Sequence, residues 1–273
     1  MKITTIDRRW IFLFILIGVG LPLMLPLGFK LEVTPNVQTV YNLIESTPEN
    51  KVVLLSFDYD PASKPELHPM AFGIIKHAID RKQKVACLAL WPMGSQMVDD
   101  VYQNLKKEMP DIEYGRNFIN LGYKAGGIVT IQAMGKNLKN VFPSDANGTP
   151  ITNYSILNSI HTLKDFAWIC SFSAGTPGLK EWIMVAKDKY NIPVTGGTTA
   201  VSTPGFLPYL NDQNQLTGLL GGLKNAAEYE FLIQRKGTAT AGMDAQSVAH
   251  IIIIAFIVLG NVAFFVSKKR KKD

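Results

Sequence analysis

The sequence predicts an α/β domain with a doubly wound, mostly parallel sheet, Rossmann-like or flavodoxin-like, between an N-terminal and a C-terminal transmembrane helix. Apolar runs of strand length alternate with helical patterns through the middle of the chain, which favours right-handed βαβ crossovers. Those runs are continuous, as is typical of strands that are covered on both faces. Two long uncharged apolar stretches near the chain ends predict the membrane helices.

The first apolar stretch runs from Trp10 to Phe29 and contains no charged residue. An α-helix needs about 20 apolar residues to cross the hydrocarbon core of a bilayer. Residues 10–29 are therefore expected to form a membrane helix that follows a tail over residues 1–9. A cleaved signal peptide is the alternative interpretation, but no small-x-small cleavage site precedes Lys30, which favours a retained anchor.

The second apolar stretch, residues 251–266, is also uncharged, and its flanks extend the predicted membrane helix to residues 248–267. A basic tail follows over residues 268–273. Asn261 is the strongly polar side chain within this helix. Because an amide in lipid prefers a hydrogen-bonding partner, Asn261 is expected to face another helix.

The charge of the chain is concentrated at its ends. The formal net charge is +6, of which residues 1–9 contribute +2 and residues 267–273 contribute +4, so the interior is neutral. A neutral interior argues against nucleic acid as a partner. Basic residues on the distal side of both apolar stretches predict that both termini are cytoplasmic and that residues 30–247 form an extracytoplasmic domain, periplasmic, extracellular or lumenal.

The elements of this domain are predicted from its apolar patterns. Strands are expected over residues 52–59, 84–91, 126–134, 166–173 and 192–197. Helices are expected over residues 65–82, 95–109, around 152–163, 177–190 and 216–234. A short helix over residues 37–45 is expected to join the first membrane helix to the sheet.

Two cysteines and two glycosylation patterns bear on the compartment of the domain. Cys87 and Cys170 each lie within an apolar strand-like run, so packing as small buried side chains is preferred over a disulfide between them. Asn147 and Asn153 each begin an Asn-x-Ser/Thr pattern, which matters only in a host that glycosylates this compartment.

A ligand-binding rim is expected where the strands end, because ligands of doubly wound sheets bind beyond the carboxyl ends of the strands, where the strand order reverses. The residues expected at this rim are polar or glycine: Asp58, Asp60, Ser95, Gln132, Ser171, Ser173, Thr176, Gly196, Gly197 and Thr198. No cofactor is predicted, because the Walker lysine and the dinucleotide-binding glycine spacing are both missing.

Asp58 and Asp60 admit two interpretations. Two carboxylates after a buried strand, with His68 nearby, are weak candidates for a metal site. The pattern is similar to the first motif of haloacid-dehalogenase-type phosphatases and to the Asp-x-Asp of some glycosyltransferases, but Pro61 follows and no paired-aspartate motif comes after a later strand. The preferred interpretation is that Asp60 and Pro61 begin a turn, with no metal.

Small residues are expected to form a contact face on the last helix of the domain. Gly218, Gly221 and Gly222 fall at helical spacings within the helix predicted over residues 216–234. Because glycine disfavours a helix by about 1 kcal/mol relative to alanine, close packing against another helix is the expected compensation.

Three functions remain open on the sequence, in order of preference. The first is a double-anchored interaction or assembly subunit of a larger membrane complex, with other membrane proteins or a second copy as partners. The second is a membrane-tethered domain that binds or senses a small ligand. The third is a metal-dependent hydrolase or transferase that uses Asp58 and Asp60; the absence of a complete catalytic constellation favours a non-enzymatic role.

Overall fold

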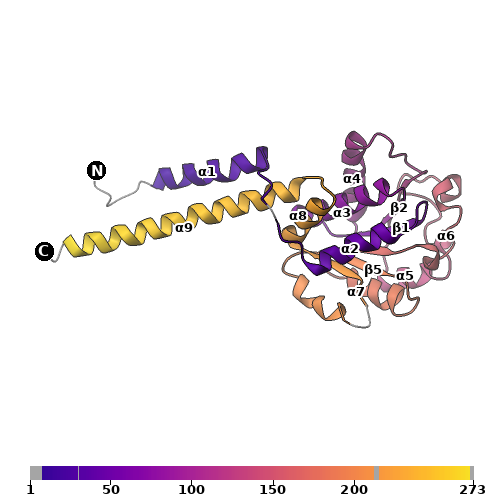
Figure 1. The fold of residues 1–273 in the computed structure, drawn as a ribbon. Helices are drawn as coiled ribbons and strands as arrows, with labels where there is room; N and C mark the ends of the chain where they lie inside the picture. The colour runs from indigo at the N-terminus through magenta and orange to yellow at the C-terminus, as the bar shows by residue number, and fades with distance from the viewer. Residues whose placement is uncertain (1–7, 30, 212–214, 271–273) are drawn as a thin grey trace. The chain divides into compact units, whose positions relative to one another are not determined.

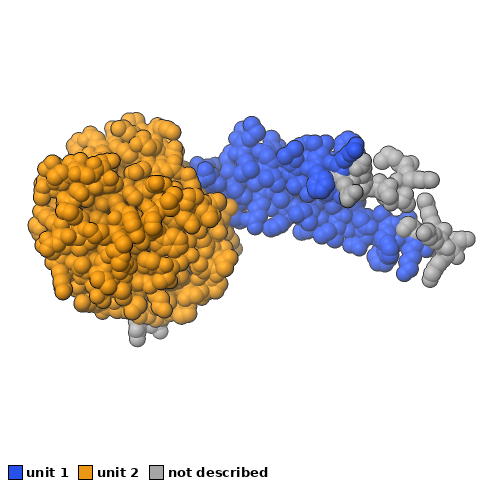
Figure 2. All heavy atoms as spheres, turned by 180° about the vertical axis from the view of Figure 1, so that it is seen from behind, with its two compact units in different colours: residues 1–31, 236–273 blue, residues 32–235 orange. Residues whose placement is uncertain are grey.

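The computed structural model describes residues 8–29, 31–211 and 215–270, and these residues belong to two compact units. Figure 2 distinguishes the units by colour: one contains residues 1–31 and 236–273, and the other contains residues 32–235. Parts of the two expected tails, residues 1–7 and 271–273, lie outside the described residues.

The first unit is built from the helices α1 (Arg8–Met24) and α9 (Thr238–Arg270). Among the described residues, one helical segment is long and apolar enough to cross a membrane, Thr238–Val266 of α9. α1 is a shorter apolar helix with Pro22 inside it. Of the two full-length membrane helices expected, the structure therefore supports the C-terminal one, because α1 ends five residues before Phe29.

The two helices pack against each other in antiparallel directions. The rings of Phe14 and Phe256 lie with their centroids 6.1 Å apart. One turn further along α1, Gly18 lies against Ile252 so closely that a β-carbon there would be 2.2 Å from the Ile252 Cδ1. Going along α1 to higher residue numbers, the contacted residues of α9 therefore have lower numbers, so the two helices run antiparallel.

The second unit contains a six-stranded, all-parallel sheet in the order β3-β2-β1-β4-β5-β6 (Figure 1). The strands are β1 (Val52–Asp58), β2 (Lys84–Ala89), β3 (Phe118–Tyr123), β4 (Ile169–Ser173), β5 (Val194–Thr198) and β6 (Gly218–Gly221). The predicted α/β class and the parallel sheet are confirmed, and the arrangement fits a Rossmann-like fold.

The strand expected over residues 126–134 is wrong, and the nearby strand β3 was not expected. The run 126–134 forms α5 (Ile128–Met134), in which Ile131 and Met134 are buried while Val129 is exposed, a helical spacing. Gly126 and Gly127 adopt positive φ angles of 114° and 51°, which a strand does not accommodate. The strand in this region is β3, whose apolar run is interrupted by Asn120.

The last predicted helix and the helix around 152–163 also differ from the structure. Residues 218–221 form β6, and the helix α8 (Gly222–Leu232) begins only at Gly222. Residues 151–165 form three short 3-10 turns, η1 (Ile151–Asn153), η2 (Ser155–Leu157) and η3 (Leu163–Asp165). Short apolar segments rich in turn formers carry too few residues for their periodicity to specify one state.

Helices cover both faces of the sheet. They are α2 (Pro35–Ser46), α3 (Lys64–Asp80), α4 (Gly94–Glu108), α6 (Leu138–Val141), α7 (Leu179–Trp182) and its π-helical continuation η4 (Ile183–Lys187), besides α5 and α8. On β5, a β-carbon at Gly196 would meet Leu179 of α7, and one at Gly197 would meet Met70 of α3. Because successive strand residues project to opposite faces, α7 and α3 lie on opposite sides of the sheet.

The two cysteines are free and buried, as the sequence interpretation preferred. Cys87 on β2 and Cys170 on β4 are both paired in register with Leu55 of the strand between them. Two inter-strand spacings of about 4.8 Å separate their backbones by about 9.6 Å, beyond the roughly 7 Å that a disulfide can bridge.

Candidate functional site

Asp58, the last residue of β1, is fully buried and accepts four hydrogen bonds. Its Oδ1 accepts from the Ser56 hydroxyl at 2.7 Å and from the Leu90 backbone N–H at 3.0 Å. Its Oδ2 accepts from the Ser171 hydroxyl at 2.8 Å and from the Trp182 indole N–H at 3.3 Å. The carboxyl group thereby connects β1 with β4, with the residue that follows β2, and with α7.

The electrostatics of this cluster follow from its burial. Removal from water raises the pKa of Asp58 to about 6, and the four donors, which favour the carboxylate, only partly oppose this effect. With no exposed surface, Asp58 cannot contact a ligand in this conformation. Its hydrogen bonds hold together the carboxyl ends of β1 and β4 and the helix α7.

Asp60 lies in a turn, apart from Asp58. One of its carboxylate oxygens accepts a hydrogen bond from the Ala62 backbone N–H at 3.0 Å, two residues further along the chain. This arrangement is an Asx turn, the geometry that an Asp-Pro sequence favours. The two aspartates therefore do not converge on a common point.

His68 belongs to a separate cluster. Its Nδ1 lies 3.0 Å from the Tyr59 hydroxyl and its Nε2 lies 3.1 Å from a carboxylate oxygen of Asp100, which also contacts the Lys64 ammonium. Burial, followed by the nearby Lys64 charge, lowers the pKa of His68 to about 4. Within the described part of the chain, no group of three or more His, Cys, Asp and Glu side chains is arranged to hold a metal ion.

A crevice of about 660 Å³ opens at the carboxyl ends of the strands. Its walls come from the segments that follow β2, β3 and β4, and they include Trp91, Tyr123, Gly126, Gly127, Thr176, Pro177 and Glu181. The Trp91 indole N–H donates to the Pro177 carbonyl oxygen at 2.7 Å, which joins the β2 and β4 segments. The crevice lies beside the β1–β4 pair, where the strand order reverses direction.

The predicted rim residues are dispersed by the structure. Thr176 lines the crevice, whereas Ser171 and Ser173 are buried and bond within the protein. Ser95 accepts from the Asn120 side chain and lines a neighbouring cavity of about 320 Å³. Gln132 is exposed on α5.

The rim expectation is wrong for the three residues of β5. Gly196, Gly197 and Thr198 are buried strand residues. At Gly196 and Gly197 the nearest side-chain atoms lie 2.4 Å and 2.7 Å from where a β-carbon would be, so these glycines admit close packing of helices. The contact of Gly197 with Met70 leaves no room there for a ligand.

Sequence reasoning missed several residues of this region. Trp182 lies nine positions beyond the end of β4, inside a helix, and nothing local in the sequence relates it to Asp58. Gly126 and Gly127 carried a usable signal, since paired glycines mark a turn more strongly than a strand. Glu181, whose carboxylate accepts from the Gly178 N–H at 2.7 Å, is the one charged side chain that lines the crevice among the residues the structure describes.

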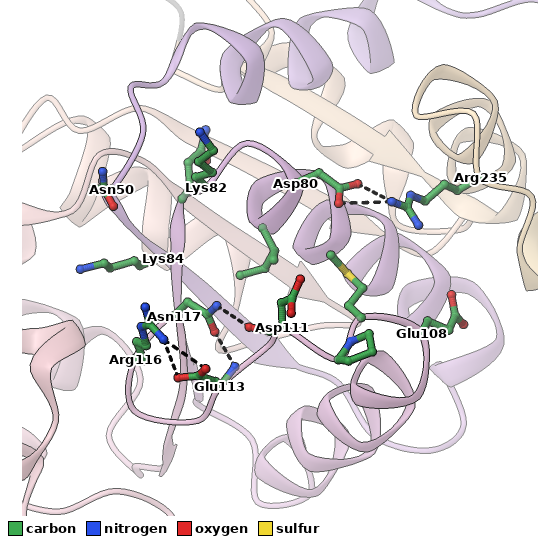
Figure 3. Close-up of a pocket in the computed structure, with 14 residues that line it drawn as sticks. Asn50, Asp80, Lys82, Lys84, Glu108, Asp111, Glu113, Arg116, Asn117 and Arg235 are labelled. Atoms are coloured by element: carbon green, nitrogen blue, oxygen red, sulfur yellow. Dashed lines mark hydrogen bonds and ion pairs between the residues drawn. The ribbon is translucent and has the colours of Figure 1, made fainter.

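A second depression, of about 710 Å³, lies at the opposite, amino edge of the sheet (Figure 3). Figure 3 shows two ion pairs within it: Arg235 contacts Asp80 at 3.0 Å, and Arg116 contacts Glu113 at 3.0 Å. Its wall has as many acidic as basic side chains, Asp80, Glu108, Asp111 and Glu113 beside Lys82, Lys84, Arg116 and Arg235. Because the acidic and basic side chains of this depression are equal in number and partly paired, little net charge remains to attract a ligand. The crevice at the carboxyl ends of the strands is therefore the better candidate site.

The predicted helix–helix contacts have mixed outcomes. Gly218 and Gly221 lie in β6, so the expectation that they belong to a helix face is wrong; a β-carbon at Gly218 would meet Val40 of α2 at 2.7 Å. Gly222 begins α8 with a positive φ of 65°. Asn261 is exposed on α9 and donates to the Ile257 carbonyl oxygen of its own helix at 3.0 Å.

Comparisons with protein-family models, curated proteins and solved structures find no match for this chain. Since a fold class alone hosts many functions, the function has to be argued from the site itself.

Proposed function

We propose that this protein is a membrane-anchored binding domain, in which α1 and α9 both cross the bilayer and the extracytoplasmic α/β unit takes a small ligand in the crevice. The observation that carries the proposal is the crevice itself, about 660 Å³ in volume, beside the point where the strand order reverses. Ligands of doubly wound sheets bind at this position.

The antiparallel packing of α1 and α9 supports two crossings. It brings Arg9 and Lys268 to the same end of the first unit, where a positive charge is expected on the cytoplasmic side. Large apolar side chains along both helices are exposed, for example Phe12, Leu16, Ile254 and Phe265, as a lipid environment requires.

The segment after α1 explains how a 17-residue helix can be part of a crossing. Asp244 of α9 is buried, and its carboxylate accepts from the backbone N–H groups of Gly28 at 2.7 Å and Phe29 at 3.2 Å. Non-helical backbone at membrane depth needs such internal partners, because lipid offers none. The apolar residues 25–29 can therefore complete the crossing that α1 begins.

The walls of the crevice indicate the kind of ligand. Two aromatic side chains, Trp91 and Tyr123, stand beside Pro177 and the glycine turn at 126–127. Tyr123 is 41% exposed, so its ring is available for contact. Apolar walls with few polar groups suit a small ligand that has a flat apolar or ring-shaped surface.

Topology can be tested by cysteine labelling in intact cells. The native Cys87 and Cys170 are fully buried, so the wild-type chain should not react with an impermeant maleimide and serves as the control. Asn147→Cys on the exposed surface should react before lysis. Reaction only after lysis would mean that the α/β unit is cytoplasmic, and the anchored arrangement would be wrong.

Ligand binding can be tested with the full chain in nanodiscs against a panel of small metabolites, with the midpoint of thermal unfolding as the readout. A ligand at 100 times its Kd stabilises the folded state by about 2.7 kcal/mol. Thr176→Trp should fill the crevice and abolish the shift, whereas Thr152→Trp, an exposed position in η1, should retain it. Shifts that survive Thr176→Trp would place binding elsewhere.

The assembly role is the second candidate. Its specific support is the long apolar surface of α9, which α1 covers only over part of its length. Two of its other supports are weaker than the sequence suggested, because Gly218 and Gly221 lie in a strand and Asn261 bonds within its own helix. Ligand binding is therefore placed first.

A further inference from the structure

The ion pairs of the α/β unit are confined to one part of it. Among the described residues, all nine pairs involve residues outside 117–223. Residues 117–190 nonetheless contain seven lysines, no arginine and four acidic residues. This part of the chain therefore carries a formal net charge of +3 (seven minus four), and none of its lysines forms an ion pair among the described residues.

Each acidic residue in this segment is engaged locally. Asp145 accepts from the hydroxyls of Tyr114 and Tyr154 at 2.9 and 2.8 Å. The Asp165 carboxylate caps the turn of η3, and that of Glu181 accepts from the Gly178 N–H. Asp188 accepts from the Gln215 amide at 3.3 Å. None of the four lies within 4.0 Å of a lysine ammonium in the described structure.

Six of the lysines lie on the layer formed by α5, α6, η3, α7 and η4, and we call them the lysine face: Lys136, Lys139, Lys164, Lys180, Lys187 and Lys189. Two of these lysines contact the ring of Tyr190. The ammonium groups of Lys164 and Lys189 lie 5.3 and 5.4 Å from its ring centroid. A β-carbon at Gly135, next to Lys136, would touch the Tyr190 hydroxyl.

Apolar side chains are exposed within the same layer. Met184 of η4 is 47% exposed and Val129 of α5 is 66% exposed. Met184 lies four positions after Lys180 and three before Lys187, so the three residues belong to one continuous helical segment. The layer thus offers apolar contacts with a rim of positive charge, the usual anatomy of a protein interface.

We infer that the lysine face is a docking surface for an acidic polypeptide segment that carries apolar or aromatic residues. Charge complementarity carries the inference, because none of these six ammonium groups pairs with a carboxylate among the described residues. Carboxylates of the partner would pair with the lysines, and its apolar residues would cover Val129 and Met184. None of the six lysines, nor Val129 or Met184, lines the crevice, so the inference does not depend on the proposed ligand site.

The composition of the face favours a polypeptide over phosphate-bearing partners. Surfaces that recognise phosphate groups typically use arginine, whose planar fork makes paired hydrogen bonds, and residues 117–190 contain none. The exposed Met184 and Val129 add a contribution that nucleic acid backbones would not use.

The test uses the full chain in phosphatidylcholine nanodiscs at physiological salt, with a fluorescent Glu/Tyr copolymer as the probe. The wild type should bind this copolymer, and more tightly than poly-glutamate. The triple variant Lys136→Glu, Lys180→Glu, Lys187→Glu should weaken binding by about tenfold or more, as reversed charges at an interface do. Val129→Ser should weaken binding of the copolymer while leaving that of poly-glutamate unchanged.

A matched control separates the lysine face from net charge. Lys82, Lys106 and Lys107 are exposed and lie outside the face, so reversing these three changes the net charge equally and should leave affinity within about twofold. If the first triple fails to fold, the Lys→Gln triple at the same positions should still reduce affinity. Equal losses in both triples, no copolymer binding, or binding only to phosphatidylglycerol vesicles or to oligo(dT) would overturn the inference.

Discussion

The indole N–H of Trp182 in α7 donates a hydrogen bond to the Asp58 carboxylate of β1, with 3.3 Å between nitrogen and oxygen. The two residues are 124 positions apart in the sequence, and both are fully buried. Each carboxylate oxygen of Asp58 accepts from one rotatable hydroxyl and one N–H group that can only donate. In an Asp58→Asn variant, the side-chain NH₂ would therefore face the N–H of Leu90 in one orientation of the amide and that of Trp182 in the other.

The pH dependence of stability should carry the signature of Asp58. Burial raises its pKa to about 6 from an ordinary 3.8, so the folded chain holds this proton more tightly than the unfolded chain. The contribution of Asp58 to the free energy of unfolding should fall by about 3 kcal/mol as the pH rises from about 4 to about 6, and then remain constant. Urea unfolding of residues 32–235 and of its Asp58→Asn variant across this range measures the difference. Parallel curves would contradict the shift.

Removing one hydrogen-bond donor to Asp58 should lower the free energy of unfolding most at a pH where the Asp58 carboxylate is charged. Ser171→Ala deletes a hydrogen bond to Asp58 Oδ2 in a fully buried site. We expect a loss of about 1–3 kcal/mol in the free energy of unfolding at pH 7.5, and a smaller loss at pH 4.5. Ser155→Ala, an exposed serine in η2, is the control and should have little effect.

The glycines of β5 should not tolerate a methyl group. At Gly196 and Gly197 an alanine β-carbon would lie 2.4 Å from Leu179 and 2.7 Å from Met70. Overpacking of this kind costs about 1–3 kcal/mol of the free energy of unfolding. At Gly205, which has open space around it, alanine should be neutral. Equal stability of all three variants in chemical unfolding would show that the sheet and its helices can separate without cost.

The two thiols should remain reduced and unreactive. Burial raises the pKa of both Cys87 and Cys170, which disfavours the reactive thiolate. Counting thiols under oxidising conditions should find both free, with none accessible until the chain unfolds. A reductant should leave the midpoint of unfolding unchanged; a lower midpoint would reveal a disulfide.

Divalent metal should not stabilise the α/β unit through Asp58 and Asp60. The first carboxylate is saturated with donors and the second accepts within its own turn. Millimolar Mg²⁺ or Ca²⁺ should leave the unfolding midpoint of the wild type unchanged. The midpoint of Asp60→Asn should equal that of the wild type with or without metal, since asparagine retains the Asx-turn acceptor. A shift in the wild type alone would restore the metal interpretation.

Asn261→Leu separates the two functional candidates. If α9 associates with another membrane helix through this amide, the variant should reduce the mass of the detergent-solubilised complex, because such contacts contribute about 0.6–2 kcal/mol each. Unchanged mass and unchanged membrane insertion would remove Asn261 from any assembly role. Leucine at this exposed position does not itself disfavour the helix.

The sheet class could be predicted from sequence because β1 and β2 are largely apolar and β4 lies within the mostly apolar run 166–173. In β5, Val194 is the one large apolar residue, beside two threonines and two glycines. β3 could not be predicted, because buried Asn120 interrupts it, and the partners that satisfy its amide come from elsewhere: Nδ2 donates to Asp99 at 2.8 Å. β6 is four residues long and contains two glycines, too short for any periodicity to distinguish it from the helix that follows.

The site was harder to predict than the fold, for a related reason. A strand end places several residues near the crevice, but burial depends on what the next helix covers. Ser171 points to Asp58 and Thr176 lines the crevice, although both were expected at the same rim. Tertiary contacts of this kind, such as that of Trp182 with Asp58, leave no local pattern in the sequence.

The pairing of α1 with α9 has a consequence for the order of events during biosynthesis. Among the described elements α1 comes first and α9 comes last, so α1 leaves the ribosome long before its partner exists. Val266 follows the end of β6 by 45 residues, which take about 2–9 s to synthesise. Parallel sheets of this kind fold in milliseconds to seconds, so the strands can pair while the C-terminal helix is still being made. Pairing of α9 with α1 would then follow the assembly of the sheet.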